Sequence, residues 1–285
     1  MMNIQSYDAQ LRRGLLFPDR HQRGSSLIAV LLILLLITVL GVYAMRQGLA
    51  TLNISTNAQV RQLLVQSSDT VLNGFTQTDV NTLTNAAGAI GLAMINQQAA
   101  VSSSVSSAEY VFCYRPATTQ GFAQSQNTNV IAASTTDQAT LLDGGHGGFC
   151  DLTADFGSNR KAAVTQVAVT LPRDTAPIGA YLVQGTWSAQ LPSGVTNPQR
   201  VRITATSMLP AFSNTPVSTV QTTCLGSTDG STAGRISDNT LQLQTNPSTA
   251  PESLTDCLSR LGVPANTQVQ EYNAIATLCP AGTTC

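Results

Sequence analysis

The sequence has few charged, aromatic and histidine residues, and these shortages exclude several classes of function. Only 10% of the 285 residues are charged, and Lys161 is the sole lysine. Because no basic patch is evident, nucleic acid is not expected to be an obligatory partner. His146 is the only histidine beyond residue 21 and no Cys-x-x-Cys occurs, which leaves no ligand set typical of zinc. We therefore expect no metal and no cofactor.

Catalytic motifs are missing as well. The stretch Gly145-His146-Gly147-Gly148 is similar to the oxyanion loop of some esterases, but no Gly-x-Ser-x-Gly turn supplies a nucleophile. The segment Ser227–Gly230 matches part of the sequence pattern of a calcium-binding loop. The alternating carboxylates and the terminal glutamate of that pattern are absent, which favours an ordinary Asp-Gly turn. Trp187 is expected in the core rather than as a ligand platform. The sequence therefore predicts a protein that is not an enzyme.

What the sequence does contain is one long apolar run, Leu27 to Met45, without a charged side chain. Its 19 residues would span about 28 Å as a helix, close to the hydrocarbon thickness of a bilayer. Four arginines and two aspartates precede the run, whereas Arg46 follows it and the next charge is Arg61. The positive-inside rule then predicts a single pass with a cytoplasmic N-terminus and a periplasmic C-terminal domain.

The start of the run suggests proteolytic processing. Gly24 stands between Arg23 and Ser25, and no small-x-small signal-peptidase site follows the run. This arrangement resembles a type IV prepilin leader, which implies cleavage between Gly24 and Ser25 on the cytoplasmic side. A glycine suits such a cut because it leaves the backbone open to a protease. The alternative is an uncleaved signal anchor in which the glycine has no role.

The helix is expected to continue beyond the apolar run, because small and apolar residues recur at spacings of three and four and no proline occurs before Pro116. The predicted helix begins at Ser25, ends near residue 75 and is about 75 Å long. Such a helix cannot be buried in one small domain, so its first half must pack against lipid or other protein. The membrane and assembly residues would be Leu27, Ile28, Ala29, Leu31, Leu35 and Val39, and the stripe that continues them is Leu49, Leu52, Thr56, Val60, Leu63, Ser67 and Val71.

Residues 76–285 are expected to form an α+β head domain. A second helix is predicted over 79–98, with Val80, Leu83, Ile90 and Met94 on one side, and a short one over 251–261. Strands are expected at 109–114, 167–171, 181–187 and 201–205, and their period of two indicates one packed and one wetter face. The turn-rich segment between Cys113 and Cys150 is expected to be a surface loop, and little regular structure is expected from 211 to 250. The predicted fold is an antiparallel meander of three or four strands laid on the outer half of the long helix.

All six cysteines lie on the side predicted to be outside, where an oxidising compartment favours disulfides. Six cysteines allow fifteen pairings, and the sequence does not choose among them. Our hypothesis is nearest-neighbour pairing: Cys113 with Cys150, Cys224 with Cys257, and Cys279 with Cys285.

The first 75 or so residues resemble type IV pilins, in particular PilX-like minor pilins. The resemblance rests on Arg23-Gly-Ser-Ser-Leu-Ile-Ala-Val-Leu-Leu, Met45-Arg46-Gln47 and Asn57-Ala-Gln-Val-Arg-Gln-Leu-Leu64. It implies a leader of residues 1–24 that prepilin peptidase removes, Ser25 as the N-methylation candidate, and a pilin helix over 25–75 with its transmembrane part at 27–45. It also implies a pilin-like fold, with the helix packed against the small sheet.

The same resemblance implies partners and a role. The partners would be other minor and major pilins, prepilin peptidase, the inner-membrane assembly platform and membrane lipid. The protein would pass from the inner membrane to the pilus at the cell surface. It would join an initiation or tip complex that primes pilus assembly and supports twitching motility, adhesion or DNA uptake.

Two residues depart from the pattern of major pilins. The fifth mature residue is Ala29 instead of glutamate, which favours a place at the top of the fibre, and the first is Ser25 instead of phenylalanine. Two alternatives stay open. One is a tip pseudopilin of a type II secretion system, and the other is a signal-anchored periplasmic adhesin or binding domain that forms no fibre.

Overall fold

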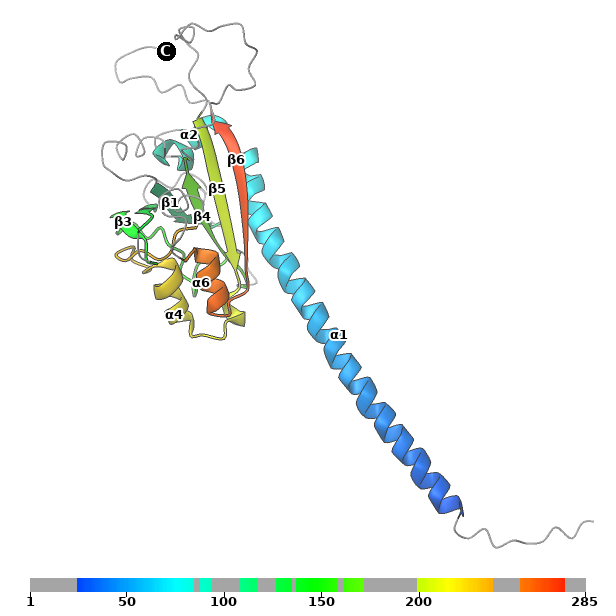
Figure 1. Ribbon diagram of the computed structural model, residues 1–285. Coiled ribbons are helices and arrows are strands. Elements are labelled where there is room, and N and C mark those ends of the chain that lie inside the picture. The colour runs from blue at the N-terminus through cyan, green and yellow to red at the C-terminus, as the bar shows by residue number, and fades with distance from the viewer. Residues whose placement is uncertain are drawn as a thin grey trace, which may run out of the picture. The chain divides into compact units, whose positions relative to one another are not determined.

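The protein divides into two compact units, residues 1–57 and residues 58–285. The computed structural model describes residues 25–84, 88–93, 108–116, 127–134, 137–157, 161–171, 199–237 and 252–274. Helix α1 (Ser25–Gln77) belongs to both units, while the remaining helices and all strands belong to the second (Figure 1). The structure is thus α+β, with a long N-terminal apolar helix and a separate antiparallel sheet.

Helix α1 is one unbroken helix of 53 residues. Gly41 and Gly48 lower helix propensity, yet neither interrupts it. From Leu27 to Ile54 the large apolar side chains are all exposed, with between 53% and 72% of their surface accessible. This part of the helix therefore contributes nothing to the core of its own unit.

The described strands form one six-stranded antiparallel sheet in the order β3-β2-β1-β4-β5-β6. Their bounds are β1 Ala108–Cys113, β2 Asn129–Ala132, β3 Thr140–Asp143, β4 Val164–Thr170, β5 Gln199–Met208 and β6 Ala265–Ala274. The expected meander of three or four strands is too small, because β2, β3 and β6 join it. The strand expected at 181–187, with Trp187, lies outside the described residues.

The expected surface loop between Cys113 and Cys150 is wrong, because it contains β2 and β3. All four residues of β2 are buried, and they pair with β1 from Asn129 opposite Val111 to Ala132 opposite Ala108. The apolar run at β2 is only Val130-Ile131-Ala132-Ala133, between Asn129 and Ser134, and the register of β2 with β3 shifts between Val130 and Ile131. A strand this short and irregular leaves no period-two signal in the sequence.

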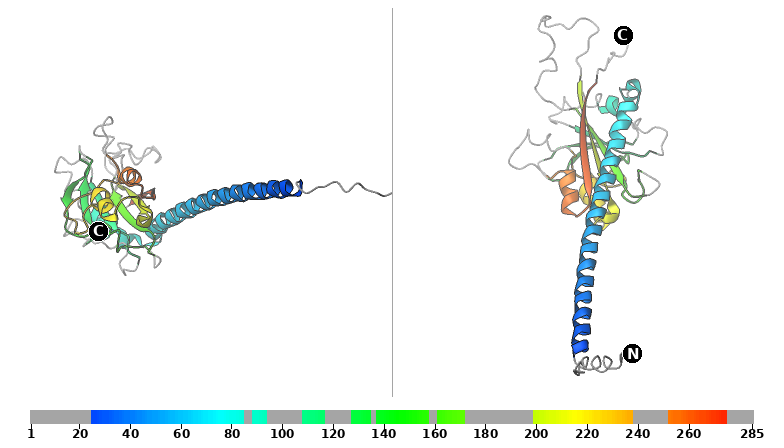
Figure 2. Two further views of the ribbon diagram at one scale, coloured as in Figure 1. Left: turned by 90° about the horizontal axis from the view of Figure 1, so that it is seen from below. Right: turned by 90° about the vertical axis from the view of Figure 1, so that its right-hand side faces the viewer.

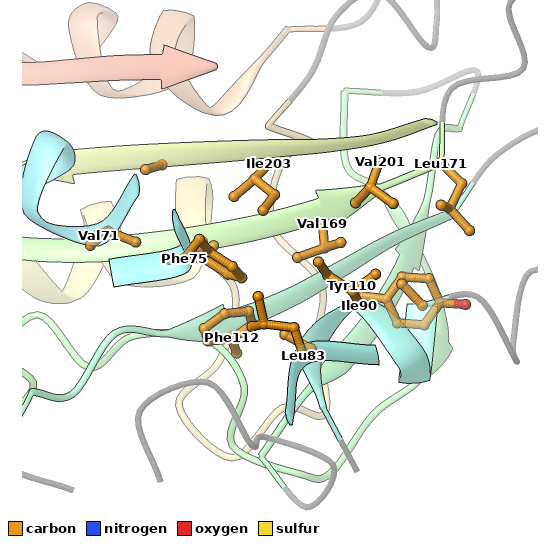
Figure 3. Packing of buried hydrophobic residues seen from close by; sticks show 14 of the residues in the cluster. Val71, Phe75, Leu83, Ile90, Tyr110, Phe112, Val169, Leu171, Val201 and Ile203 are labelled. Atoms are coloured by element: carbon orange, nitrogen blue, oxygen red, sulfur yellow. The ribbon is translucent and has the colours of Figure 1, made fainter. Parts of the chain in front are cut away.

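One face of the sheet packs against the last turns of α1. Val71 and Phe75 meet Phe112 of β1 and Ile203 of β5, in a cluster that also takes in Tyr110, Val169, Val201 and Leu171 (Figure 3). The turned view in Figure 2 shows these helical turns alongside β6. The expected stripe is confirmed at Val71, which is fully buried, but Leu63 is 36% exposed and the adjacent Leu64 is buried in its place. Ser67 is half-buried and the adjacent Ser68 is fully buried. Spacings of three and four fit both neighbouring rows of a helix, so periodicity alone does not choose between them.

The helix expected over 79–98 is not one helix. Helix α2 spans Val80–Thr84, Gly88 lies in a bend, and residues 89–93 are helical again. Leu83 and Ile90 are buried in the cluster as expected, but Val80 is 60% exposed. A Cβ at Gly88 would lie 2.2 Å from the carbonyl oxygen of Thr82, so this bend requires glycine. Residues 94–98, including Met94, lie outside the described residues.

The other face of the sheet is covered too, which corrects the expectation of a wetter face. Every residue of β1 and β4 is buried, and alternate residues such as Val111, Ile131 and Ala168 pack with Phe149 and Ile236. The covering elements come from the stretch expected to be irregular and from the short helix. They are α4 (Val217–Val220), the π-helical turn η2 (Gln221–Leu225) and α6 (Leu254–Arg260), which pack in one cluster with Val164 and Met208. The short helix η1 (Pro210–Phe212) follows β5.

Helix α6 begins and ends with the signals that its sequence carries. Ser253 caps it by accepting a hydrogen bond from the backbone N–H of Asp256, and Gly262 follows it at φ +73°. Leu254 and Leu258 are buried as predicted, in a cluster with Cys257. The bounds differ from the prediction at the start, because Pro251 lies outside the described residues and the helix begins at Leu254.

Candidate membrane and assembly helix

The first part of α1 presents apolar side chains on all sides rather than along one stripe. The predicted membrane and assembly residues from Leu27 to Val39 are all exposed on it, Ala29 among them. It is the one helix among the described residues that is long and apolar enough to cross a membrane. A helix that is apolar all round needs apolar surroundings, which a bilayer or other apolar helices supply.

Thr38 and Gln47, two polar side chains at this part of α1, donate hydrogen bonds to groups of the same helix. Thr38, in the middle of the apolar run, donates from Oγ1 to the carbonyl oxygen of Leu35 at 2.8 Å. Such a bond removes most of the penalty of placing a hydroxyl in hydrocarbon. Near the end of the run, Gln47 Nε2 donates to Tyr43 Oη at 2.9 Å. Tyr43, Arg46 and Gln47 thus form a polar boundary of the kind found where helices leave a bilayer.

The predicted cleavage site straddles the start of the described chain. Ser25 is the first residue of α1, and Gly24 lies outside the described residues. No acidic residue occurs in α1 before Asp69, so a carboxylate is absent at Ala29 and throughout the apolar segment.

Two disulfides join cysteines that our hypothesis pairs as nearest neighbours, Cys113 with Cys150 and Cys224 with Cys257. All four are fully buried in one cluster, with Leu152, Met208 and Leu258 among its members. The first bond joins the end of β1 to Cys150, and the second joins η2 to α6. Cys279 and Cys285 lie outside the described residues.

The glycine-rich loop around His146 is held by its neighbours. Gly145 N–H donates to the carbonyl oxygen of Gly230 at 2.9 Å, and His146 N–H donates to Asn129 Oδ1 at 3.3 Å. The His146 ring is half exposed, and its Nε2 lies 3.0 Å from Asp143 Oδ1. This ring faces the carboxylate of the last residue of β3, and the loop is hydrogen-bonded to Gly230 and to Asn129 of β2.

The Asp229-Gly230 turn is an ordinary turn, as expected. Gly230 adopts φ +74°, and Asp229 Oδ1 accepts hydrogen bonds from the backbone N–H and the hydroxyl of Ser231. Hydrogen bonds from Ser227 and Ser231 lower the pKa of the Asp229 carboxyl to about 2. Within the described residues no group of three His, Cys, Asp or Glu side chains could hold a metal ion.

Sequence reasoning missed a hollow beside the first disulfide. It measures about 420 Å³ and is lined by Arg115, Phe149, Asp151 and Asp155, among others. Arg115 forms a bidentate pair with Asp155, at 2.7 and 2.6 Å. Hydrogen bonds from Thr153 lower the pKa of Asp151. These charges are spread over 40 residues of sequence without a motif, so only the fold reveals their proximity.

A second missed feature is the buried carboxylate of Glu109 on β1. It is 1% exposed, and its two oxygens accept from the backbone N–H of Ser237 at 3.1 and 2.8 Å. The bond fixes residues 233–237 on the sheet face opposite α1, which is a structural role. No protein-family model, no curated protein and no solved structure matches this chain.

Proposed function

We propose that the chain is a minor pilin of a type IV pilus that joins an initiation or tip complex and primes pilus assembly. The observation that carries the proposal is the continuity of α1. One helix of 53 residues is apolar on all sides in its first part and forms the core of an α+β head with its last turns. The resemblance of residues 23–64 to PilX-like minor pilins supports the same assignment.

Continuity matters because a membrane anchor alone does not need it. A tethered periplasmic domain is held equally well by a flexible linker after the span. Here one helix supplies both the apolar segment and part of the core of the head. The resemblance implies one helix with both tasks in a pilin, so this continuity supports the proposal.

In this mechanism the apolar segment first resides in the inner membrane and then packs against the helices of other subunits. Both settings cover the exposed side chains from Leu27 to Ile54 with apolar atoms. A carboxylate at the centre of a bilayer costs about 2.5–3.5 kcal/mol on insertion scales, so it persists where a neighbour neutralises it. With Ala29 in that place, the subunit needs no such partner, which favours a position at the end of the fibre.

The decisive experiment determines the mature N-terminus. Mass spectrometry of the membrane-extracted protein is expected to find Ser25 as the first residue, and Gly24→Leu is expected to retain residues 1–24. Deleting the gene should remove surface pili or twitching motility, and the wild-type copy, but not the Gly24→Leu copy, should restore them. Retention of Met1 or Met2 in the wild-type membrane protein would contradict the proposal and favour the signal-anchored domain.

The absence of a carboxylate at position 29 also fits a tip pseudopilin of a type II secretion system. The two functions differ in their phenotype. Loss of a secreted protein with intact pili would identify the pseudopilin, whereas loss of pili with intact secretion identifies the minor pilin. Cleavage before Ser25 is expected in both cases, so the phenotype and the processing site answer separate questions.

A further inference from the structure

Two kinds of contact hold the last turns of α1 on the sheet. Val71, Leu72 and Phe75 enter the hydrophobic cluster with β1, β4 and β5 (Figure 3). One turn earlier the contacts are polar. Ser67 Oγ lies 2.8 Å from Thr165 Oγ1 of β4, and Asn266 Nδ2 of β6 donates to Ser68 Oγ at 2.9 Å.

The polar contacts continue across the sheet in one row. Thr165 pairs in register with Ser207, which pairs in turn with Asn266, and the Thr165 and Ser207 hydroxyls lie 2.8 Å apart. We call Ser67, Ser68, Thr165, Ser207 and Asn266 the polar seam. Ser68, Thr165 and Ser207 are 0% exposed, as is Val71 in the cluster. These three seam residues are therefore as buried as Val71, whereas Ser67 and Asn266 are half-buried.

The polar seam and the hydrophobic cluster differ in the free energy needed to separate α1 from the sheet and admit water. Hydroxyl and amide groups of the seam exchange their mutual hydrogen bonds for bonds to water, whereas the cluster loses apolar burial with no replacement. Ser68 also donates within the helix, to the carbonyl oxygens of Leu64 and Val65. Leu64 is buried but belongs to none of the three hydrophobic clusters found among the described residues. Leu64 is thus the one buried apolar side chain among residues 58–69, whereas residues 71–77 bury three, Val71, Leu72 and Phe75.

We propose that residues 58–69 of α1 lift off the sheet reversibly while residues 71–77 stay docked, so that the polar seam is a built-in opening point. Twelve helical residues correspond to about 18 Å of helix that separates before the cluster is disturbed. The open state exposes a row of hydroxyls and an amide on β4, β5 and β6. The inference concerns the head and its own helical turns, and it holds whether or not the chain is a pilin.

The test compares cysteines placed on the two sides of the boundary. Ser68→Cys and Val71→Cys are introduced separately into the full chain, with Cys279→Ser and Cys285→Ser to remove those two thiols. Each variant is labelled with N-ethylmaleimide in detergent micelles under native conditions. Because both positions are 0% exposed, labelling measures opening, and Ser68→Cys is expected to react at least tenfold faster than Val71→Cys.

A second pair reports from the sheet. Ser207→Cys and Ala205→Cys are both 0% exposed and lie two residues apart on β5, beneath the seam and beneath the cluster. Ser207→Cys is again expected to react at least tenfold faster. Circular dichroism verifies the fold of each variant, and if Ser68→Cys does not fold the β5 pair decides alone. Rates within twofold of each other in either folded pair would show that the helix opens as one unit, and would overturn the proposal.

Discussion

The two parts of α1 differ in burial, and the difference is the opposite of what their hydropathy suggests. From Leu27 to Met45 every large apolar side chain is exposed, whereas from residue 58 to Gln77, where polar residues predominate, five side chains are buried. No other part of the described chain covers the more apolar part, whereas the more polar part contributes side chains to the core of the head. The apolar content of a helix thus indicates how much of its surface needs apolar contacts. The arrangement of its apolar residues, in one stripe or all round, indicates whether the same chain supplies those contacts.

We therefore expect the two parts of α1 to contribute to different free energies, the last turns to folding of the head and the apolar run to association with the membrane. Changes in the last turns of α1 should alter the stability of the head and leave membrane association unchanged. Changes in the apolar run should do the opposite. Four experiments challenge this division, in order of decreasing effect.

Phe75→Ala is expected to have the largest effect. Phe75 is 2% exposed and its ring lies 6.4 Å from that of Phe112. Truncation leaves a cavity between α1 and β1, so the free energy of unfolding should fall by about 3–5 kcal/mol. Denaturant unfolding in micelles, followed by near-ultraviolet circular dichroism, measures the loss. The matched control is Leu35→Ala, which is 58% exposed and should leave head stability unchanged; equal losses in both variants would refute the division.

Removing the second disulfide should rank next. Cys224 and Cys257 are 33 residues apart, and opening a loop of this size lowers stability by about 3–4 kcal/mol in the chain-entropy model. Cys224→Ala with Cys257→Ala is therefore expected to unfold at lower denaturant concentration while remaining fully membrane-associated. Carbonate extraction of membranes measures the association. Release of the variant from the membrane would mean that the head helps to hold the anchor.

Leu34→Arg tests the other side of the comparison. Leu34 lies within the apolar run and is 53% exposed. An arginine at the centre of a spanning helix costs about 2.5–3.5 kcal/mol on insertion scales, so membrane integration should fall. The head should still form both disulfides and unfold at the wild-type denaturant concentration. Leu34→Ala serves as the control, and a head that unfolds at lower denaturant in Leu34→Arg alone would break the comparison.

The smallest effect concerns pH and lies wholly in the head. Hydrogen bonds from Arg260, at 2.6 and 2.9 Å, and the nearby Arg235 lower the pKa of Glu252 from its ordinary value of 4.5. A lowered folded-state pKa stabilises the protein above about pH 4.5, and this stabilisation is lost as the pH falls through the folded value. Glu252→Gln should therefore lose less stability than wild type between about pH 6 and pH 3. Asp69→Asn, on the exposed side of α1, is the control, and identical pH profiles for wild type and Glu252→Gln would exclude this contribution.

Part of the fold could be predicted from local patterns. The run from Leu27 to Met45, the alternation in β4 and β5, and the leucines and following glycine of α6 match the structure. The helix expected over 79–98 is interrupted at Gly88, and α4 and η2 lie where little regular structure is expected. The pairing of Cys113 with Cys150 and of Cys224 with Cys257 follows chain order. The cleavage site at Gly24 and Ser25 stays a prediction from the sequence.

The missed features depend on residues that meet only in the fold. β2 is a short apolar run that becomes a buried strand because β1 offers it an open edge. Both faces of β4 are buried because residues from 217–237 and 254–258 pack over the side opposite α1, although the Ser, Thr and Gly content of 211–250 predicts little regular structure. The hollow at Arg115 and the row of hydroxyls at Thr165 join side chains from separate strands and loops. No window of sequence contains such neighbours.

The position of β6 in the sheet has a consequence for the order in which the head forms. β6 is the last described strand, and it supplies contacts to α1 across 198 residues at Asn266–Ser68 and across 200 residues at Tyr272–Leu72. Contacts of such high sequence separation slow folding, because a long loop must close before they form. During synthesis, which proceeds from the N-terminus, α1 is complete long before the strand that closes over it exists. Ser68 and Leu72 of α1 therefore lack their contacts with β6 until synthesis has passed Tyr272.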